Sequence, residues 1–95
     1  MKLMTKELEA RFKAVGSQEN VPDPIVIAKF FDPCGSWTWY ATEWNAEEGT
    51  FYGLVCGMEK ERGYFSLEEL QAYRGRFGLG IERDLYFDET LISTL

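Results

Sequence analysis

Three apolar runs separated by short polar segments occupy the middle of this chain. Residues 25–31 (IVIAKFF), 37–44 (WTWYATEW) and 51–58 (FYGLVCGM) are rich in the β-branched and aromatic residues that favour strands. The first two runs are joined through Asp32-Pro33-Cys34-Gly35, which has the residue preferences of a type I turn. Strands joined so closely pair antiparallel, because a parallel pair needs a crossover of a dozen or more residues. The runs therefore predict a three-stranded antiparallel meander.

Helix signals stand on both sides of this meander. Thr5 is a suitable N-cap for a helix that ends at Gly16, with Leu8, Phe12 and Val15 on one face. The sequence Ser66-Leu67-Glu68-Glu69 is a capping box that opens a helix over residues 67–74, after a charged loop over residues 59–63. Residues 81–87 alternate as a half-exposed edge strand. The prediction is an α+β fold of order α-β-β-β-α-β. Its antiparallel sheet has about four strands, with one or two helices packed on one face.

The second run predicts which rings enter the core. Trp37 and Trp39 share a strand face with the small Ala41, whereas Tyr40 and Trp44 lie on the other face. We expect the first set to point inward. Two glycines in the third run, Gly53 and Gly57, indicate a β-bulge or a large ring packed across the strand.

Composition narrows the function classes. A chain of 95 residues predicts a single domain over residues 1–95. The absence of histidine excludes histidine metal sites and Ser-His or Cys-His nucleophile pairs, and no cofactor is expected. No signal peptide or membrane span is expected, so we expect a cytoplasmic protein with Cys34 and Cys56 as free thiols.

Four strings in the chain are specific enough to suggest a relationship. The run DPIVIAKFFDPCGSWTWYATEW, followed by FYGLVCG, GYFSLEEL and IERDLYF, resembles a family of about one hundred residues catalogued as a domain of unknown function. The resemblance extends from Leu3 to Phe87. That family is carried on bacterial plasmids, integrative elements and phages, so the resemblance implies a mobile-element protein of the bacterial cytoplasm. It carries over no catalytic or binding residue.

An aromatic cluster is the first candidate for a binding surface. It comprises Trp37, Trp39, Tyr40, Trp44, Phe51 and Tyr52. Such rings can form a stacking platform for single-stranded nucleic acid, but a small sheet also needs large rings to bury enough area. We favour the interpretation that these rings form the core and cross-strand pairs. A net charge of −6 repels phosphate, so no direct nucleic-acid binding is expected.

An excess of carboxylates is the second candidate. Sixteen Asp and Glu stand against ten Lys and Arg. The leading hypothesis is a non-catalytic accessory protein of a mobile element that binds a protein partner through an acidic surface. Its sharper form is inhibition of a host nucleic-acid-binding defence complex at its basic site. Ordinary solubility charge explains the same excess, and a homodimer is a further possible assembly. The expected partner-binding residues are Glu43, Glu47, Glu48, Glu82, Asp84 and Trp44.

An enzyme is the alternative from a different class. Glu82 and Asp84, two residues apart on one strand face, are suited to acid–base chemistry or Mg²⁺ binding. Their spacing is not specific, and Arg83 points to the opposite face. Catalysis is therefore less favoured than protein binding, and no catalytic residue is assigned.

Overall fold

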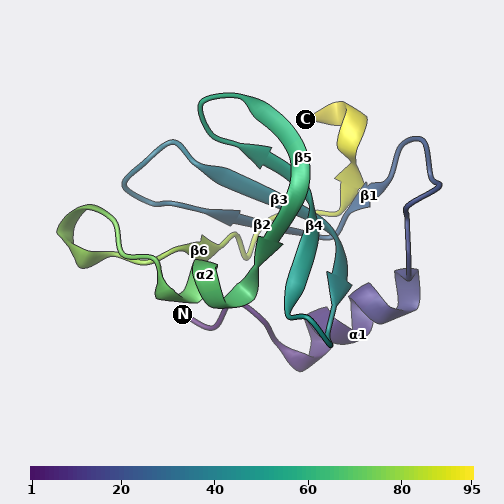
Figure 1. Ribbon diagram of the computed structural model, residues 1–95, viewed down its shortest axis with the longest axis horizontal. Helices are drawn as coiled ribbons and strands as arrows, with labels where there is room; N and C mark the ends of the chain where they lie inside the picture. Colours follow the sequence, from purple (N-terminus) through teal and green to yellow (C-terminus); the bar gives the residue numbers. More distant parts are fainter.

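The computed structural model describes residues 1–95, and its fold is α+β (Figure 1). The helices are α1 (Lys6–Val15) and α2 (Leu67–Ala72), with two short 3₁₀ helices, η1 (Arg76–Gly78) and η2 (Ile92–Thr94). The strands are β1 (Ile25–Val26), β2 (Ala28–Phe31), β3 (Thr38–Asn45), β4 (Thr50–Cys56), β5 (Lys60–Ser66), β6 (Glu82–Arg83) and β7 (Thr90–Leu91). A five-stranded antiparallel sheet has the order β5-β4-β3-β2-β6, and β1 pairs with β7 in a separate two-stranded sheet.

Both helices begin where their capping residues predict. The Thr5 hydroxyl accepts a hydrogen bond from the Leu8 N–H at 3.1 Å, and α1 stops at Gly16, whose φ of 72° suits glycine. The Ser66 hydroxyl accepts one from the Glu69 N–H at 2.9 Å. Each helix therefore has a first-turn N–H satisfied by a side chain. The second helix ends at Ala72, two residues earlier than expected.

The predicted meander is confirmed as β2, β3 and β4, with one interruption. Residues 25–31 do not form one strand: the chain leaves β1 at Val26 and enters β2 at Ala28. Between them, the Ile27 N–H donates to the Ala41 carbonyl at 2.8 Å. The turn that follows β2 is also as predicted, since the Gly35 N–H donates to the Asp32 carbonyl at 3.2 Å.

Two predictions about strands are wrong. Residues 59–63 are not a loop, because Lys60 begins β5, which pairs with the whole of β4. The Gly57 N–H donates to the Glu59 carbonyl at 3.1 Å and closes a tight hairpin that leaves the charged residues on an exposed edge strand. Residues 81–87 are not one strand either. Only Glu82 and Arg83 pair with β2, and the chain then turns as the Asp84 carboxylate accepts the Tyr86 N–H at 2.9 Å.

A β-bulge in β3 changes which rings share a face. The register with β4 shifts between Ala41 and Glu43, so one extra residue is accommodated there. Trp44 therefore returns to the face of Ala41 and packs on Phe51 with ring centroids 4.7 Å apart. The prediction that Trp44 lies opposite Trp39 and Ala41 is wrong, because strict alternation ends at the bulge.

Phe51 is the centre of the core. It is fully buried and contacts four rings: Phe12 of α1, Phe30 of β2, Trp44 of β3 and Phe65 of β5. Leu70 of α2 belongs to the same cluster, so both helices pack on one face of the sheet, as predicted. In Figure 1 they lie on the lower side, and the C-terminal segment lies on the upper side.

The two tryptophans expected in the core have different environments. Trp39 packs against the core cluster. Trp37 is 44% exposed, so the prediction that it points into the core is wrong. Its ring lies across Gly57, where an added Cβ would stand 2.4 Å from the indole. Gly57 therefore leaves room for a large ring packed across the strand, as its position in the sequence indicated.

Candidate functional site

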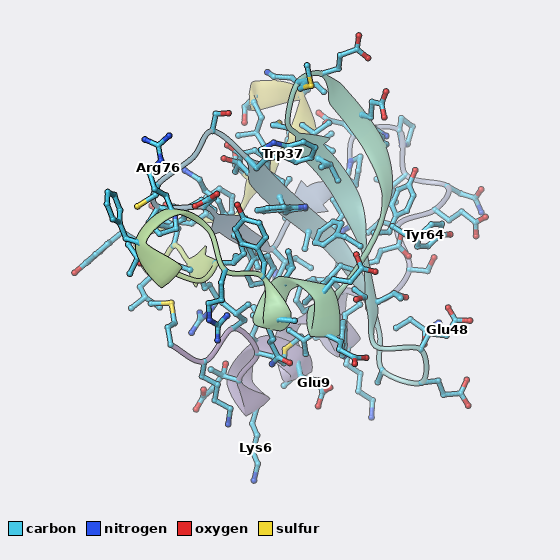
Figure 2. The ribbon with its side chains drawn as sticks, turned by 60° about the vertical axis from the view of Figure 1, so that its left-hand side comes forward. Lys6, Glu9, Trp37, Glu48, Tyr64 and Arg76 are labelled. Atoms are coloured by element: carbon cyan, nitrogen blue, oxygen red, sulfur yellow. The ribbon has the colours of Figure 1, made fainter.

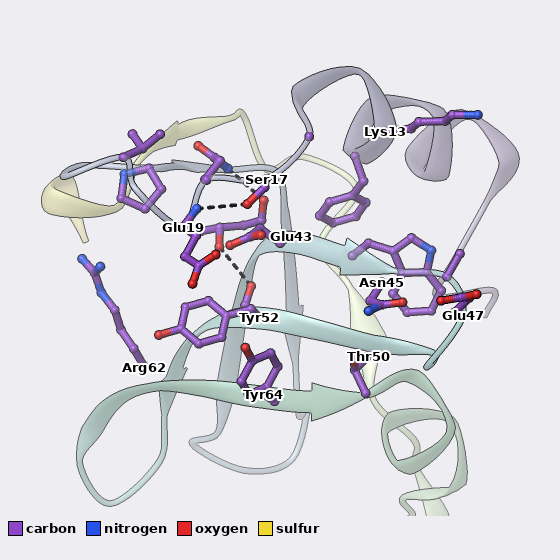
Figure 3. A pocket seen from close by; sticks show the side chains of 18 residues that line it. Lys13, Ser17, Glu19, Glu43, Asn45, Glu47, Thr50, Tyr52, Arg62 and Tyr64 are labelled. Atoms are coloured by element: carbon purple, nitrogen blue, oxygen red, sulfur yellow. Dashed lines mark hydrogen bonds between the residues drawn. The ribbon is translucent and has the colours of Figure 1, made fainter.

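A groove of about 740 Å³ lies between the connector formed by residues 16–24 and strands β3, β4 and β5 (Figure 3). Its position follows from the pleat of β4. Phe51 points to the helix-covered face, and the next residue, Tyr52, points to the opposite one, which we call the open face. The groove has the dimensions of a site for a peptide segment or a small ligand.

Two tyrosines on neighbouring strands form part of the groove lining. Tyr52 of β4 is directly opposite Tyr64 of β5, and their rings meet edge to face with centroids 4.9 Å apart. Tyr52 is half-buried, whereas Tyr64 is 77% exposed. A large ring that exposed has little role in the core, so it is available to a partner.

The connector wall is held in place by the buried side chain of Gln18. Its amide donates to the Ile25 carbonyl at 2.9 Å and to the Thr42 carbonyl at 2.8 Å, and accepts from the Ile25 N–H at 2.7 Å. Thr42 is the residue at the bulge, where the ladder leaves its carbonyl free. Gln18 therefore ties the groove wall to the bulge of β3. The sequence carried no signal for this role.

Unpaired carboxylates line the same groove. Glu19, Glu43 and Glu47 have no hydrogen bond or ion pair to their side chains, and the lining bases are Lys13 and Arg62. The two ion pairs of the protein lie outside the groove: Arg11 with Glu89 at 2.8 Å, and Lys29 with Asp84 at 3.6 Å. The groove carboxylates are therefore free to meet a cationic partner.

Trp44 connects this groove to the core. Its ring packs on Phe51, and its indole N–H donates to the Glu9 carboxylate of α1 at 2.9 Å. The side chain is half-buried and also lines the groove. Of the residues that the sequence proposed for partner binding, the structure brings Glu43, Trp44 and Glu47 together here.

Further acids surround the tip of the β3–β4 hairpin. Glu48 lies at the tip, where its N–H donates to the Asn45 side chain at 3.2 Å. The tip touches the start of α2, because the Leu67 N–H donates to the Gly49 carbonyl at 3.0 Å. The exposed Glu68 and Glu69 therefore lie near this tip. Figure 2 shows Glu48 and the α1 residue Glu9 projecting from the lower part of the molecule.

The other two proposed residues, Glu82 and Asp84, lie elsewhere. Glu82 belongs to β6, which is at the opposite edge of the sheet from β5. Asp84 forms its ion pair with Lys29 and bonds its own turn. The structure therefore does not bring these acids to the groove. Nowhere in the chain do three Asp, Glu or Cys side chains converge in an arrangement that could hold a metal ion.

A second polar contact links the β2–β3 turn to the end of α2. The Tyr73 hydroxyl donates to the buried Asp32 carboxylate at 2.9 Å, and this bond raises the pKa of Tyr73 above its ordinary value. Asp32 also accepts the N–H of Cys34 at 3.0 Å. Because both carboxylate oxygens bind structural donors, we assign this contact to folding. Cys34 and Cys56 are free thiols, as predicted.

The sequence matches a known protein family. A family model described as "Protein of unknown function (DUF2958)" matches residues 3–94. No curated protein and no solved structure matches the chain. Within the structure, neither helix has the length and apolar character needed to cross a bilayer.

Proposed function

The chain belongs to the DUF2958 family of proteins of unknown function, and we propose that it is a non-catalytic protein that binds a basic segment of a protein partner. One observation carries the proposal: the unpaired carboxylates of Glu19, Glu43 and Glu47 line the same groove as the Tyr52–Tyr64 pair. Carboxylates recognise Lys and Arg by charge, and tyrosine faces attract the same cations. The groove therefore offers both contacts to one basic segment.

The charge distribution supports a fast, steered encounter. The net charge of −6 repels acidic molecules, and the acids at the hairpin tip and on α2 extend the negative surface beyond the groove. Charges arranged in this way raise the association rate of an oppositely charged partner. They also make the association sensitive to salt, because the Debye length is about 8 Å at physiological ionic strength.

The biological setting of the proposal comes from the sequence resemblance. Plasmids, integrative elements and phages must evade host defence nucleases. The basic partner in the sharpest form of the proposal is therefore the nucleic-acid-binding site of a host defence complex. The protein would act by occupying that site in place of nucleic acid. A partner of this kind has the positive surface that the groove requires.

A direct test uses a fluorescent arginine-rich peptide as the probe, with a glutamate-rich peptide of equal length as the negative control. We expect the first to bind, with an affinity that falls as salt rises. Glu43→Gln combined with Glu47→Gln should weaken binding about three- to tenfold, since each exposed charge pair contributes up to about 1 kcal/mol. Fluorescence anisotropy measures both effects.

The matched control variant is Glu59→Gln with Glu61→Gln. It changes net charge by the same amount at exposed positions that do not line the groove. If both double variants weaken binding equally, total charge explains the affinity and the groove has no special role. The proposal is contradicted if the protein with Glu43→Gln and Glu47→Gln still binds the arginine-rich peptide at high salt.

Single-stranded nucleic acid is the second candidate ligand, favoured by the tyrosine pair beside Arg62 on the open face. Exposed rings stack on bases, and a guanidinium can contact phosphate. The carboxylates of Glu19 and Glu43 oppose it, because they line the same groove. Direct titration of a fluorescent oligothymidylate with the protein separates the two: a rise in anisotropy supports nucleic acid, and no rise supports a protein ligand.

A further inference from the structure

Strand β5 leaves a long edge of the sheet uncovered. The sheet order places β5 beyond β4 with no strand outside it. The helix that follows does not cover this edge. It leads back across the sheet, so that the Tyr73 hydroxyl just after α2 reaches Asp32 at the far end of β2. An uncovered edge of seven residues presents unpaired backbone groups to any strand that approaches.

The hydrogen-bond pattern identifies which residues present these groups. The Gly57 N–H bonds to the Glu59 carbonyl, and the Leu67 N–H bonds to the Gly49 carbonyl, so these are hydrogen-bonded pairs of the β4–β5 ladder. Such pairs recur at every second position of an antiparallel ladder. Gly63, opposite Gly53, is therefore bonded to β4 together with its second neighbours along β5. The N–H and C=O groups of Lys60, Arg62 and Tyr64 point outward.

Of these residues, Arg62 and Tyr64 flank Gly63 symmetrically, and we propose that two copies of the chain pair their β5 strands antiparallel about Gly63. Arg62 of each copy then faces Tyr64 of the other, and each of these residues completes two backbone hydrogen bonds. The side chains add a cation–π contact on each side of the symmetry axis, because Arg62 and Tyr64 are both exposed on the open face.

Charge disfavours two alternative registers. A two-fold axis perpendicular to the sheet leaves the open faces of both copies on the same side of the joined sheet. Any alternative register must therefore centre the axis on another residue of β5. An axis centred on Arg62 sets two guanidinium groups against each other, and one centred on Glu61 does the same with two carboxylates. At Gly63 the axis meets no side chain, and nothing lies within 4 Å of a Cβ placed there.

The pairing has a consequence for the groove. Because the axis is perpendicular to the sheet, both copies present their open faces on the same side. Tyr64 lines the groove of one copy and lies beside Arg62 of the other. Two acidic grooves then flank one continuous sheet, and a partner with two basic segments can engage both. The dimer rests on the edge of β5 alone and does not depend on the proposed function.

Disulfide trapping tests the register directly, in a full chain with Cys34→Ser and Cys56→Ser. Two residues facing each other at the axis have Cα atoms about 4.5 Å apart, within the range that a disulfide spans. Gly63→Cys should therefore cross-link into a covalent dimer under mild oxidation. Lys60→Cys is the matched control, because two copies of position 60 are about 20 Å apart in this register. Equal cross-linking of both variants overturns the proposal.

A charge exchange tests the side-chain contact without a cross-link. Analytical ultracentrifugation of the unmodified protein should show a mass twice that of the 11.0 kDa chain as concentration rises. Tyr64→Arg sets like charges against each other and should abolish this dimer. Adding Arg62→Glu to Tyr64→Arg should restore it, because opposite charges then face each other at both contacts. A protein that is monomeric at all concentrations, or a double variant that fails to recover the dimer while circular dichroism shows it folded, contradicts the proposal.

Discussion

Phe51 and Tyr52 are neighbours in one strand, yet they belong to two very different surfaces. Phe51 is fully buried and contacts four rings, drawn from α1 and three strands. Tyr52 contacts one ring, that of the exposed Tyr64, and faces a groove lined with carboxylates. The same residue class thus closes the core on one face and remains accessible on the other. The helices decide the difference, since they cover the face of Phe51 and leave that of Tyr52 open.

This contrast separates stability from binding in a small protein. Truncation of a ring on the covered face removes buried area and leaves a cavity. Truncation of the exposed Tyr64 on the open face removes little buried area and mainly surface that is available to a partner. The two faces should therefore respond to substitution with effects of different size and kind. Four measurements test that separation.

The largest effect is expected for Phe51→Ala. Loss of the ring at the centre of the core should reduce the free energy of unfolding by about 3–5 kcal/mol, enough to unfold a marginal domain. Urea denaturation followed by tryptophan fluorescence measures it. Tyr64→Ala is the matched truncation on the open face and should change stability by less than about 0.5 kcal/mol. Comparable losses in the two variants would remove the distinction between the faces.

The next effect concerns the wall of the groove. Gln18→Ala leaves the Thr42 carbonyl and the Ile25 N–H without their side-chain partners, at a cost of about 1–3 kcal/mol. Hydrogen exchange should show faster exchange at Ile25 in particular. Asn20→Ala, a change at an exposed residue of the same connector, serves as the control and should be nearly silent. A silent Gln18→Ala would mean that the connector is held by other contacts.

A smaller effect is expected at the start of the helix that follows β5. Ser66→Ala removes the acceptor of the Glu69 N–H and should cost about 1 kcal/mol in urea unfolding. Ser66→Asp keeps an acceptor at the same place and should retain most of the stability. A loss below a few tenths for Ser66→Ala would show that this cap contributes little to the covered face.

The smallest effect is the pH dependence of one surface ion pair. The hydrogen bond from Arg11 holds the pKa of Glu89 below its ordinary value of 4.5. A carboxyl group with a lowered pKa adds stability that is present above its ordinary pKa and is lost as pH falls through the lowered value. Glu89→Gln should therefore lower the melting temperature slightly at neutral pH, and this difference should shrink as pH falls below 4.5. A melting shift of the same size at every pH would show that the charge of Glu89 has no part in its effect.

Local signals made much of the fold predictable. The caps at Thr5 and Ser66 act within three residues, and the Asp32–Gly35 turn acts within four, so the sequence contains all that decides them. Strand β5 was missed because its charged residues resemble a solvated loop. They are compatible with a strand because β5 is at an edge, and edge position is set by the whole sheet.

The groove was predictable only in part. Glu43, Trp44 and Glu47 were named from one segment, and the structure places them together. Tyr64 and Gln18 were not named, because they reach the groove through pairing and hydrogen bonds over long sequence separations. Gly53 did carry a signal for the bulge. It pairs with Ala41 beside the register shift, where an added Cβ would lie 1.8 Å from the Tyr40 carbonyl oxygen.

The bulge in β3 also bears on how this chain can change length over generations. It acts as a frame shift between the two halves of the strand, since every side chain after it has exchanged faces relative to a regular strand. Loss of the Thr42 codon would remove the extra residue and restore strict alternation, with Glu43 still opposite Tyr52 and Trp44 still opposite Phe51. Insertion of one more residue beside the bulge would instead turn Trp44 out of the core. Tolerance of insertions should therefore be lower in the middle of this strand than at the hairpin tip, where the exposed residues between Asn45 and Gly49 have no face to exchange.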